Sequence, residues 1–336
     1  MAKFDPDAAA QPDSGVFGLP FGRKESRIIL VQVPFDATTS YRPGTVNGPG
    51  TVLNGSMQVD LFDRTFGKVY EQGIYMMDEV DRIAKVSEKA SEVAAEIIEN
   101  GGARPEDAGL VRKVDEACEE VREYVRAEVA KILKEGKIPG VIGGEHSVPL
   151  GAIEAIAEAN PGVGILHIDA HMDLRETFEG FTYSHASIMH NVISRVPKVA
   201  KLVQIGIRDF GERELEFANM HKDKISVHFD EDWARRLMDG EKFRDLVKAA
   251  ISQLPDVVYV SFDIDALDPS LCPNTGTPVP GGLSFHQAVL ILEELKATKK
   301  KVVGFDLVEV APDHHHDDSI DGNVGARILY KLCGVC

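Results

Sequence analysis

Cysteine and tryptophan are scarce in this chain of 336 residues, which contains four cysteines and a single tryptophan. Four cysteines spread over such a length do not make the framework of a small disulfide-stapled protein. No stretch reaches the roughly 18–20 consecutive apolar residues that cross a bilayer, and the first residues lack the basic and then apolar order of a secretory signal. The sequence therefore predicts a cytoplasmic protein without a membrane segment.

Positive charge is also in deficit, because 37 Lys and Arg face 54 Asp and Glu, for a net charge of −17. Such a surface disfavours nucleic acid, whose phosphates are bound by Lys and Arg. It attracts a small cationic substrate, although acidity can serve solubility alone. Hydrophobic residues at 43% and charged residues at 27% are typical of a globular protein, which excludes disorder of the whole chain.

Short apolar runs alternate with helical patterns from residue 27 onward. The apolar runs predict buried strands at 27–35, 138–142, 163–168, 199–207, 225–229, 257–262 and 302–308. The helical patterns cover 147–158, 212–220, 243–254, 284–297 and 320–332. This alternation is typical of an α/β fold in which helices cover both faces of a parallel sheet.

The chain shows no composition break or internal repeat that would separate domains. Residues 1–26, rich in Pro, Gly and Asp, predict an extended lead-in, and residues 27–336 predict a single domain. Within it, residues 86–135 form two charged amphipathic stretches, and the second carries an apolar stripe at three- and four-residue steps. We expect a helical hairpin packed on the sheet, with a coiled-coil partner surface as the alternative.

Polar clusters follow several predicted strands, at the sheet edge where parallel α/β folds bind ligands. His146 lies in GGEHS at 143–147, and HIDAHMD occupies 167–173. Alternate side chains of an extended segment share a face, so His167, Asp169, His171 and Asp173 are expected to point the same way. Several ionisable groups at a buried strand end are costly unless a cation neutralises them. The alternative is a solvated polar loop.

A third cluster, SFDIDALDP at 261–269, places Asp263 and Asp265 on one face. Paired buried carboxylates repel each other unless they share a proton or a metal. Imidazoles and carboxylates together suit Mn, Zn, Fe or Ni, and the combined set is larger than one metal needs. It predicts a two-metal centre of the kind that makes hydroxide at neutral pH, with the ligands His146, Asp169, His171, Asp173, Asp263 and Asp265.

Together these motifs resemble those of the ureohydrolase family, which includes arginase, agmatinase and guanidinobutyrase. The matching segments are VPFDATTSYRPG at 33–44, GGEHS at 143–147, HIDAHMD at 167–173, SFDIDALDP at 261–269, NTGTPVPGGLS at 274–284 and DLVEVAP at 306–312. The resemblance implies a three-layer sandwich around a mostly parallel eight-stranded sheet. It also implies a homo-oligomer, either a trimer or a hexamer.

The resemblance implies two Mn²⁺ per chain and hydrolysis of a guanidino compound to urea and an amine. One ion would be held by His146, Asp169, Asp173 and Asp263. The other would be held by His171, Asp169, Asp263 and Asp265, so that Asp169 and Asp263 bridge. One alternative is a zinc deacetylase on a related fold, but such enzymes use one metal, and the surplus of ligands here disfavours this assignment. Another alternative is a catalytically silent oligomeric regulator, which would not need the full set of ligands.

Three catalytic roles are also implied by the resemblance. Asp173 would pass a proton to the departing amine. His185, in the segment YSHA at 183–186, matches a loop histidine that relays protons to solvent. Glu309 matches the glutamate that pairs with the guanidinium.

The substrate is the most open part of the prediction. The distance from Asp173 to His185 resembles agmatinase more than arginase, and a net charge of −17 favours a dication, so agmatine is expected. Arginine, guanidinobutyrate and aminopropylagmatine are the alternatives. Arg175 would favour a carboxylate substrate if it gripped that group bidentately, but it could instead pair with Glu176, Glu179 or another acid. Val46 replaces an arginine common in the family's loop.

Two further motifs have simpler interpretations. The segment HHHDD at 314–318 is expected to be an exposed polar loop rather than a metal site. Cys333 and Cys336 form a lone CxxC without further ligands, so neither zinc nor redox chemistry is expected there.

Overall fold

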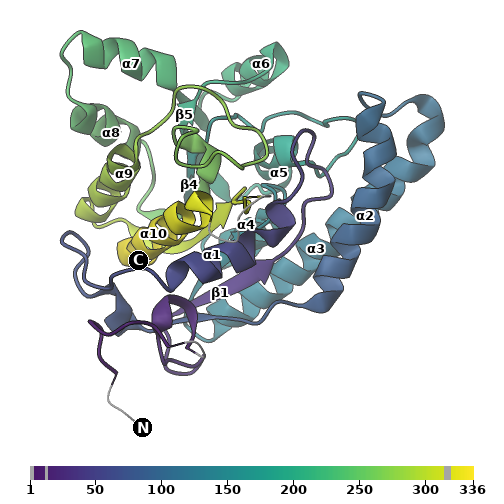
Figure 1. Cartoon of the computed structure of the whole chain (residues 1–336). Helices are drawn as coiled ribbons and strands as arrows, with labels where there is room; N and C mark the ends of the chain where they lie inside the picture. Colours follow the sequence, from purple (N-terminus) through teal and green to yellow (C-terminus); the bar gives the residue numbers. More distant parts are fainter. Residues whose placement is uncertain (1–3, 12–13, 314–318) are drawn as a thin grey trace.

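The computed structural model describes residues 4–11, 14–313 and 319–336 (Figure 1). The strands are β1 Ile28–Val33, β2 Ile74–Met76, β3 Ile138–Gly143, β4 Val163–Ile168, β5 Val199–Ile207, β6 Ile225–Phe229, β7 Val257–Asp263 and β8 Lys301–Val308. The α-helices are α1 Gly48–Ser56, α2 Asp81–Glu99, α3 Ala108–Lys134, α4 Leu150–Ala159, α5 Ile188–Arg195, α6 Glu212–Met220, α7 Asp230–Met238, α8 Phe243–Ile251, α9 Phe285–Ala297 and α10 Ile320–Val335. Within these described ranges, no helix is long and apolar enough to cross a membrane.

The eight strands form one sheet in the order β2-β1-β3-β8-β7-β4-β5-β6. Every neighbouring pair is parallel, so the prediction of a mostly parallel eight-stranded sheet is confirmed. The edge strand β2 was not predicted, because its three residues are too short to show a pattern. Since all strands run the same way, their carboxyl ends meet at one edge.

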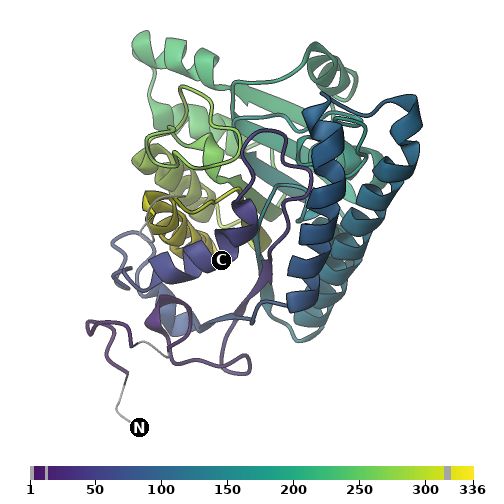
Figure 2. The same cartoon turned by 45° about the vertical axis from the view of Figure 1, so that its right-hand side comes forward.

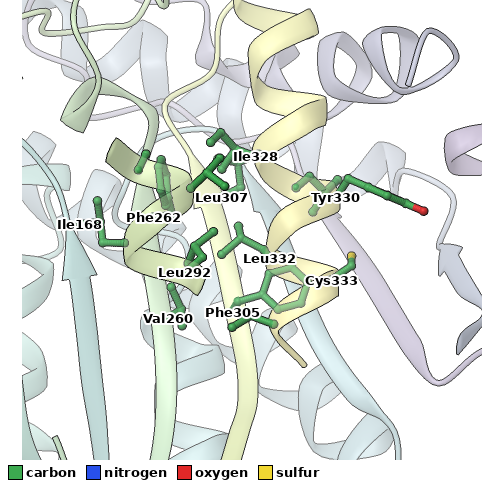
Figure 3. Close-up of a cluster of buried hydrophobic side chains, with 14 of the residues drawn as sticks. Ile168, Val260, Phe262, Leu292, Phe305, Leu307, Ile328, Tyr330, Leu332 and Cys333 are labelled. Carbon is green, nitrogen blue, oxygen red and sulfur yellow. The ribbon is translucent and has the colours of Figure 1, made fainter. Parts of the chain in front are cut away.

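Helices cover both faces of the sheet, which makes three layers (Figure 1). Alternate residues of β1 enter two different cores: Ile28 and Leu30 join one, and Ile29 and Val31 join the other. The first core includes residues of α1, α8, α9 and α10, and the second includes residues of α2, α3, α4 and α5. Figure 3 shows part of the first core, where strand residues such as Phe262 and Phe305 face α9 and α10.

The helices α2 and α3 run side by side along one flank of the molecule (Figure 2). The amphipathic segment contains these two helices, and α2 begins at Asp81, a few residues earlier than expected. The stripe of α3 is buried along its whole length, at Val114, Cys118, Val121, Val125, Val129 and Ile132. The helix α3 packs against α4, β1 and β3, so this stripe faces the protein interior.

The N-terminal lead-in differs from a purely extended segment. It contains a 3₁₀ turn at Val16–Gly18, in which Val16 and Phe17 are buried. The Phe17 ring lies 4.9 Å from the Tyr330 ring of α10, and the Phe17 amide donates to Ser56 Oγ at 3.0 Å. A short apolar turn in a Gly- and Pro-rich segment is therefore enough to fasten it to the first core.

The helix α1 was not predicted, because its sequence GPGTVLNGS contains glycines and a proline. Pro49 stands in its first turn, where its fixed φ and missing N–H are tolerated. A side chain at Gly55 would collide with the Gly322 backbone of α10, so the glycine permits close packing of the two helices. The helices α5 and α7 were not predicted either.

Candidate active site

His146 lies at the centre of a buried group of carboxylates beyond the end of β3. Its Nδ1 atom lies 3.0 Å from Asp169 Oδ2 and 3.1 Å from Asp263 Oδ2. Asp173 Oδ2 is 3.2 Å from the same nitrogen. Although three oxygens are this close, Nδ1 has no hydrogen-bond partner in the described structure. Donor atoms arranged around a common point without bonding to one another are typical of metal ligands.

A second group adjoins the first and includes His171. Its Nδ1 atom lies 3.0 Å from Asp265 Oδ2 and 3.5 Å from Asp169 Oδ1. The two carboxylate oxygens of Asp169 thus face different histidines, as a bridging ligand requires. Asp263 Oδ1 accepts a hydrogen bond from the Asp265 amide at 2.8 Å. The structure therefore brings the six predicted ligands together, and their assignment to two metals stays a prediction.

Electrostatics in this group favour a bound cation. Burial, followed by the charges of Asp265 and Asp169, raises the pKa of Asp263 well above its usual value. Burial opposes protonation of His146, but the surrounding carboxylates hold its pKa well above the usual range. A buried site with two imidazoles and four carboxylates carries excess negative charge, which a divalent metal neutralises. The residues present therefore fit a two-metal centre.

A buried row of polar side chains on neighbouring strands hydrogen-bonds to the predicted ligands. Gln204, His167 and Ser261 stand in register on β5, β4 and β7, and Ser261 is in register with Asp306 of β8. The Gln204 amide donates to His167 Nδ1 at 2.9 Å, so His167 Nε2 carries the hydrogen that it shares with Asp169 Oδ2 at 2.7 Å.

At the other end of the row, Ser261 Oγ donates to Asp306 Oδ1 at 3.1 Å. Its oxygen lies 2.9 Å from His146 Nε2 and accepts the hydrogen there. This bond orients the ring so that Nδ1 faces the carboxylates, where a bound metal would replace the proton on Nδ1. Ser261 and Asp306 begin two of the sequence motifs but were assigned no role there, and Gln204 is a single polar residue in an apolar run.

Asp173 and Glu309 both have left-handed backbone conformations, with φ of 53° and 62°. Such conformations are uncommon for residues other than glycine and cluster at functional sites. Glu309 Oε1 accepts the His146 amide at 2.8 Å, and burial followed by the charge of Glu145 raises the Glu309 pKa well above its usual value. Glu309 lies behind the ligands and does not line the cavity described next.

A cavity of about 160 Å³ opens beside the ligands. Its lining includes His171 and Asp173 from the ligand group and His185 from the loop before α5. Burial, followed by the charge of His171, lowers the pKa of His185 to about 3, so its imidazole is neutral near pH 7. Sequence reasoning had not singled out Asp209 and Phe210, which also line the cavity.

Arg175 lines the cavity, and its charge is already matched. Its Nε atom lies 3.4 Å from Glu214 Oε2, and its guanidinium stacks over the Phe178 ring at 4.7 Å. Glu214 is 4% exposed on its side chain and accepts the Leu174 amide at 3.0 Å. The partner of Arg175 is thus a distant carboxylate rather than the neighbouring Glu176 or Glu179.

The remaining motifs lie apart from this site. Cys333 is buried and Cys336 half-buried, both as free thiols. Within the described ranges, the groups of His, Cys, Asp and Glu that could hold a metal consist of predicted ligands and the adjoining His167, and none contains cysteine. The segment 314–318 lies outside the described residues.

Comparison with known proteins agrees with this geometry. Residues 26–334 match the Arginase family. The N(1)-aminopropylagmatine ureohydrolase of Thermus thermophilus is 32% identical over 323 residues, covering 94% of each chain. The enzyme of the same name from Thermococcus kodakarensis is 34% identical over 311 residues, covering 93% of this chain and 91% of the other. The crystal structure of the agmatine ureohydrolase of Thermoplasma volcanium has the same fold, with a TM-score of 0.71 at 24% identity over 94% of this chain and 91% of the other.

Proposed function

Because the chain belongs to the arginase family, whose members hydrolyse guanidino compounds, we propose that it is a manganese ureohydrolase acting on a guanidino compound that carries a second positive charge. Agmatine is the first candidate, and its products would be urea and putrescine. The reaction adds water to the guanidinium carbon and breaks its bond to the alkyl nitrogen. Assembly as a trimer or hexamer stays a prediction.

The charge of the cavity lining carries this choice of substrate. Among the described residues that line the cavity, Arg175 is the only Lys or Arg, and Glu214 pairs with it. Asp209 lines the same cavity and is exposed. A substrate carboxylate would meet Asp209 and an arginine that is already paired. A substrate ammonium would meet an acidic surface, which is the more favourable arrangement.

The proposed roles of the side chains follow from where they lie. Asp173 lines the cavity, and burial followed by the charge of Asp169 raises its pKa. A carboxylate with a raised pKa takes a proton from attacking water more readily and can deliver it to the departing nitrogen. The neutral His185 exchanges protons with solvent at the cavity wall. Glu309 does not line the cavity, so its pairing with the guanidinium is proposed on the family resemblance alone.

His146, Asp169, Asp173 and Asp263 would hold one metal, and His171, Asp169, Asp263 and Asp265 the other. When bound, two such ions supply a nucleophile from water at neutral pH and polarise the substrate. The orphaned Nδ1 of His146 is the observation in this structure that fits them best. Manganese is proposed on the family resemblance, and the carboxylates of the donor set suit it.

N1-aminopropylagmatine is the second candidate. Relatives bearing the name N(1)-aminopropylagmatine ureohydrolase are 32% and 34% identical over nearly the whole chain. This compound is also a guanidino polycation, so the acidic lining suits it equally. Its longer tail would extend past Phe210, a lining residue that is 36% exposed.

Urea release from a panel of substrates tests the proposal. The manganese-loaded protein is assayed with agmatine, N1-aminopropylagmatine, arginine, guanidinobutyrate and guanidinopropionate, and the metal-stripped protein is the blank. We expect kcat/KM for one of the two polycations to exceed that for arginine by at least about tenfold. A preference for arginine that disappears in Arg175→Ala would instead make Arg175 a carboxylate clamp and overturn the choice of substrate.

A further inference from the structure

Glu145 is a fully buried carboxylate that the mechanism above does not use. In sequence it lies between the glycines of GGEHS and His146, yet its side chain points toward Thr38, in the loop that follows β1. Its Oε2 atom accepts the Thr38 amide at 2.7 Å, and Oε1 accepts the Thr38 hydroxyl at 2.7 Å and the Ser147 hydroxyl at 2.5 Å. No Lys or Arg pairs with it in the described structure, so these donors, with the Thr39 hydroxyl at 3.5 Å from Oε2, compensate its burial.

The hydrogen bond to Glu145 determines whether the Thr38 hydroxyl donates to its other neighbours or accepts from them. A hydroxyl has one hydrogen. Burial raises the pKa of Glu145 to about 7, and in its ionised form this carboxylate can only accept. The hydrogen of Thr38 Oγ1 therefore points at Glu145, and the oxygen must act as an acceptor on its other side. There it accepts the His185 amide at 3.0 Å and lies 3.4 Å from His185 Nδ1.

An oxygen that only accepts favours a hydrogen on the ring nitrogen that faces it. The neutral His185 then carries its hydrogen on Nδ1, and Nε2 has a free lone pair. Nε2 faces Ser40 Oγ at 3.5 Å, and Ser40 lines the cavity. Ser184 Oγ, at 3.3 Å from Nδ1, suits either tautomer because its hydrogen can rotate.

We propose that Glu145 and Thr38 are positioning residues that hold His185 in the tautomer with hydrogen on Nδ1, so that Nε2 can accept a proton at the cavity. Nε2 takes up a proton that water gives up in the site and passes it to solvent within the turnover, so His185 ends as it began. The catalytic consequence rests on the proposed function, whereas the tautomer itself does not. Glu145 and Thr38 act only through His185 and do not touch the substrate.

Two substitutions reverse or remove the constraint. In Glu145→Gln, the amide oxygen is needed by the Thr38 N–H, so the amide NH₂ faces the Thr38 hydroxyl. The hydroxyl must then accept from it, and its hydrogen is free to point at His185 Nδ1, which favours the opposite tautomer. Thr38→Val removes the hydroxyl, and Thr38→Ser keeps it. Glu158→Gln, at an exposed α4 residue paired with Lys198 at 2.7 Å, is the matched control for losing a carboxylate.

Kinetics separate positioning from a general structural role. We expect Glu145→Gln and Thr38→Val to lower kcat about ten- to a hundredfold, the scale of general acid–base assistance, with KM within about twofold and bound manganese unchanged. Thr38→Ser and Glu158→Gln should keep the parental kcat. Added imidazole should restore part of the rate in Glu145→Gln, as in His185→Ala. A loss of bound metal in parallel with kcat, or no rescue by imidazole, would overturn the proposal.

Neutron diffraction of the full chain tests the tautomer directly and needs no substrate. The parent and Thr38→Ser should show hydrogen on His185 Nδ1, and Glu145→Gln should show it on Nε2. Hydrogen on Nε2 in the parent would refute the positioning role. If Glu145→Gln does not fold, the comparison of Thr38→Val with Thr38→Ser tests the proposal by itself. A parent protein that releases urea from none of the panel would refute the proposed function and leave the tautomer result standing.

Discussion

The two faces of β7 differ at its carboxyl end, although they alternate residue by residue. Val258, Val260 and Phe262 belong to the first core, and Figure 3 shows the last two near α9 and α10. On the other face, Ser261 supports His146 and Asp263 lies among the ligands. One step along the strand thus changes a residue from packing to chemistry. Stability and activity should therefore respond separately to substitutions at neighbouring positions.

The largest effect is expected on the chemical face, from Asp263→Asn. Removing this carboxylate takes away a predicted ligand of both metals, and we expect urea release to fall by more than about a thousandfold. Without metal, the variant should be no less stable than the parent. In the parent, burial and then repulsion from Asp265 and Asp169 raise the Asp263 pKa, so the charged carboxylate is unfavourable there. The measurements are urea release, metal content and thermal unfolding without metal. Full activity with one metal per chain would contradict the two-metal interpretation.

The next effect is expected on the packing face, from Phe262→Ala. Phe262 is fully buried, and removing a buried phenylalanine lowers the free energy of unfolding by about 3–5 kcal/mol. The variant that remains folded at low temperature should bind metal and release urea nearly as the parent does. Denaturant unfolding and the activity per bound metal check both halves. If activity falls as far as in Asp263→Asn, the two faces are not separable.

The same alternation explains which parts of the site the sequence could predict. Asp169 and His171, like Asp263 and Asp265, lie two residues apart within one motif, so their shared side is visible from spacing alone. Gln204, Ser261 and Asp306 each stand alone in an apolar run. Only the register across β5, β4, β7 and β8 shows that they form one row with His167.

For the fold, the alternating apolar runs were enough to predict the parallel sheet. They failed for β2, which has three residues, and for α1, whose Gly55 looks like a helix breaker until its contact with α10 is known. Tertiary contacts determine whether β2 and α1 form, and these contacts cannot be seen in the local sequence pattern. Arg175 is similar, because its partner Glu214 is far away in sequence.

A smaller effect on the chemical face is expected from Ser261→Ala. His146 keeps its place among the carboxylates but loses the acceptor at Nε2, 2.9 Å away. Partners of this kind orient a ligand histidine, and their loss lowers metal affinity about ten- to a hundredfold. Metal titration checks the effect, and excess manganese should restore most of the activity. Ser252→Ala, at the exposed end of α8, is the matched control.

The smallest effect is expected outside the residues that form the site, at His228 on the edge strand β6. Burial, followed by the charges of Arg236 and Lys201, lowers its pKa to about 4, from an ordinary value of 6.5. The folded protein thus binds this proton less tightly than the unfolded chain does. The associated stability is fully present above pH 6.5 and is lost as the pH falls toward 4.

For a half-buried group the loss at His228 amounts to about 1–2 kcal/mol, after allowance for solvent screening. We expect His228→Gln to flatten the decline in unfolding free energy between pH 6.5 and 4, with urea release at neutral pH unchanged. His286→Gln, at an exposed position of α9, controls for the loss of one histidine. If the unfolding free energy of His228→Gln declines as steeply with falling pH as that of the parent, His228 is not the cause. The decline would then come from the ligand cluster, where protonated carboxylates and histidines release the metals as the pH falls.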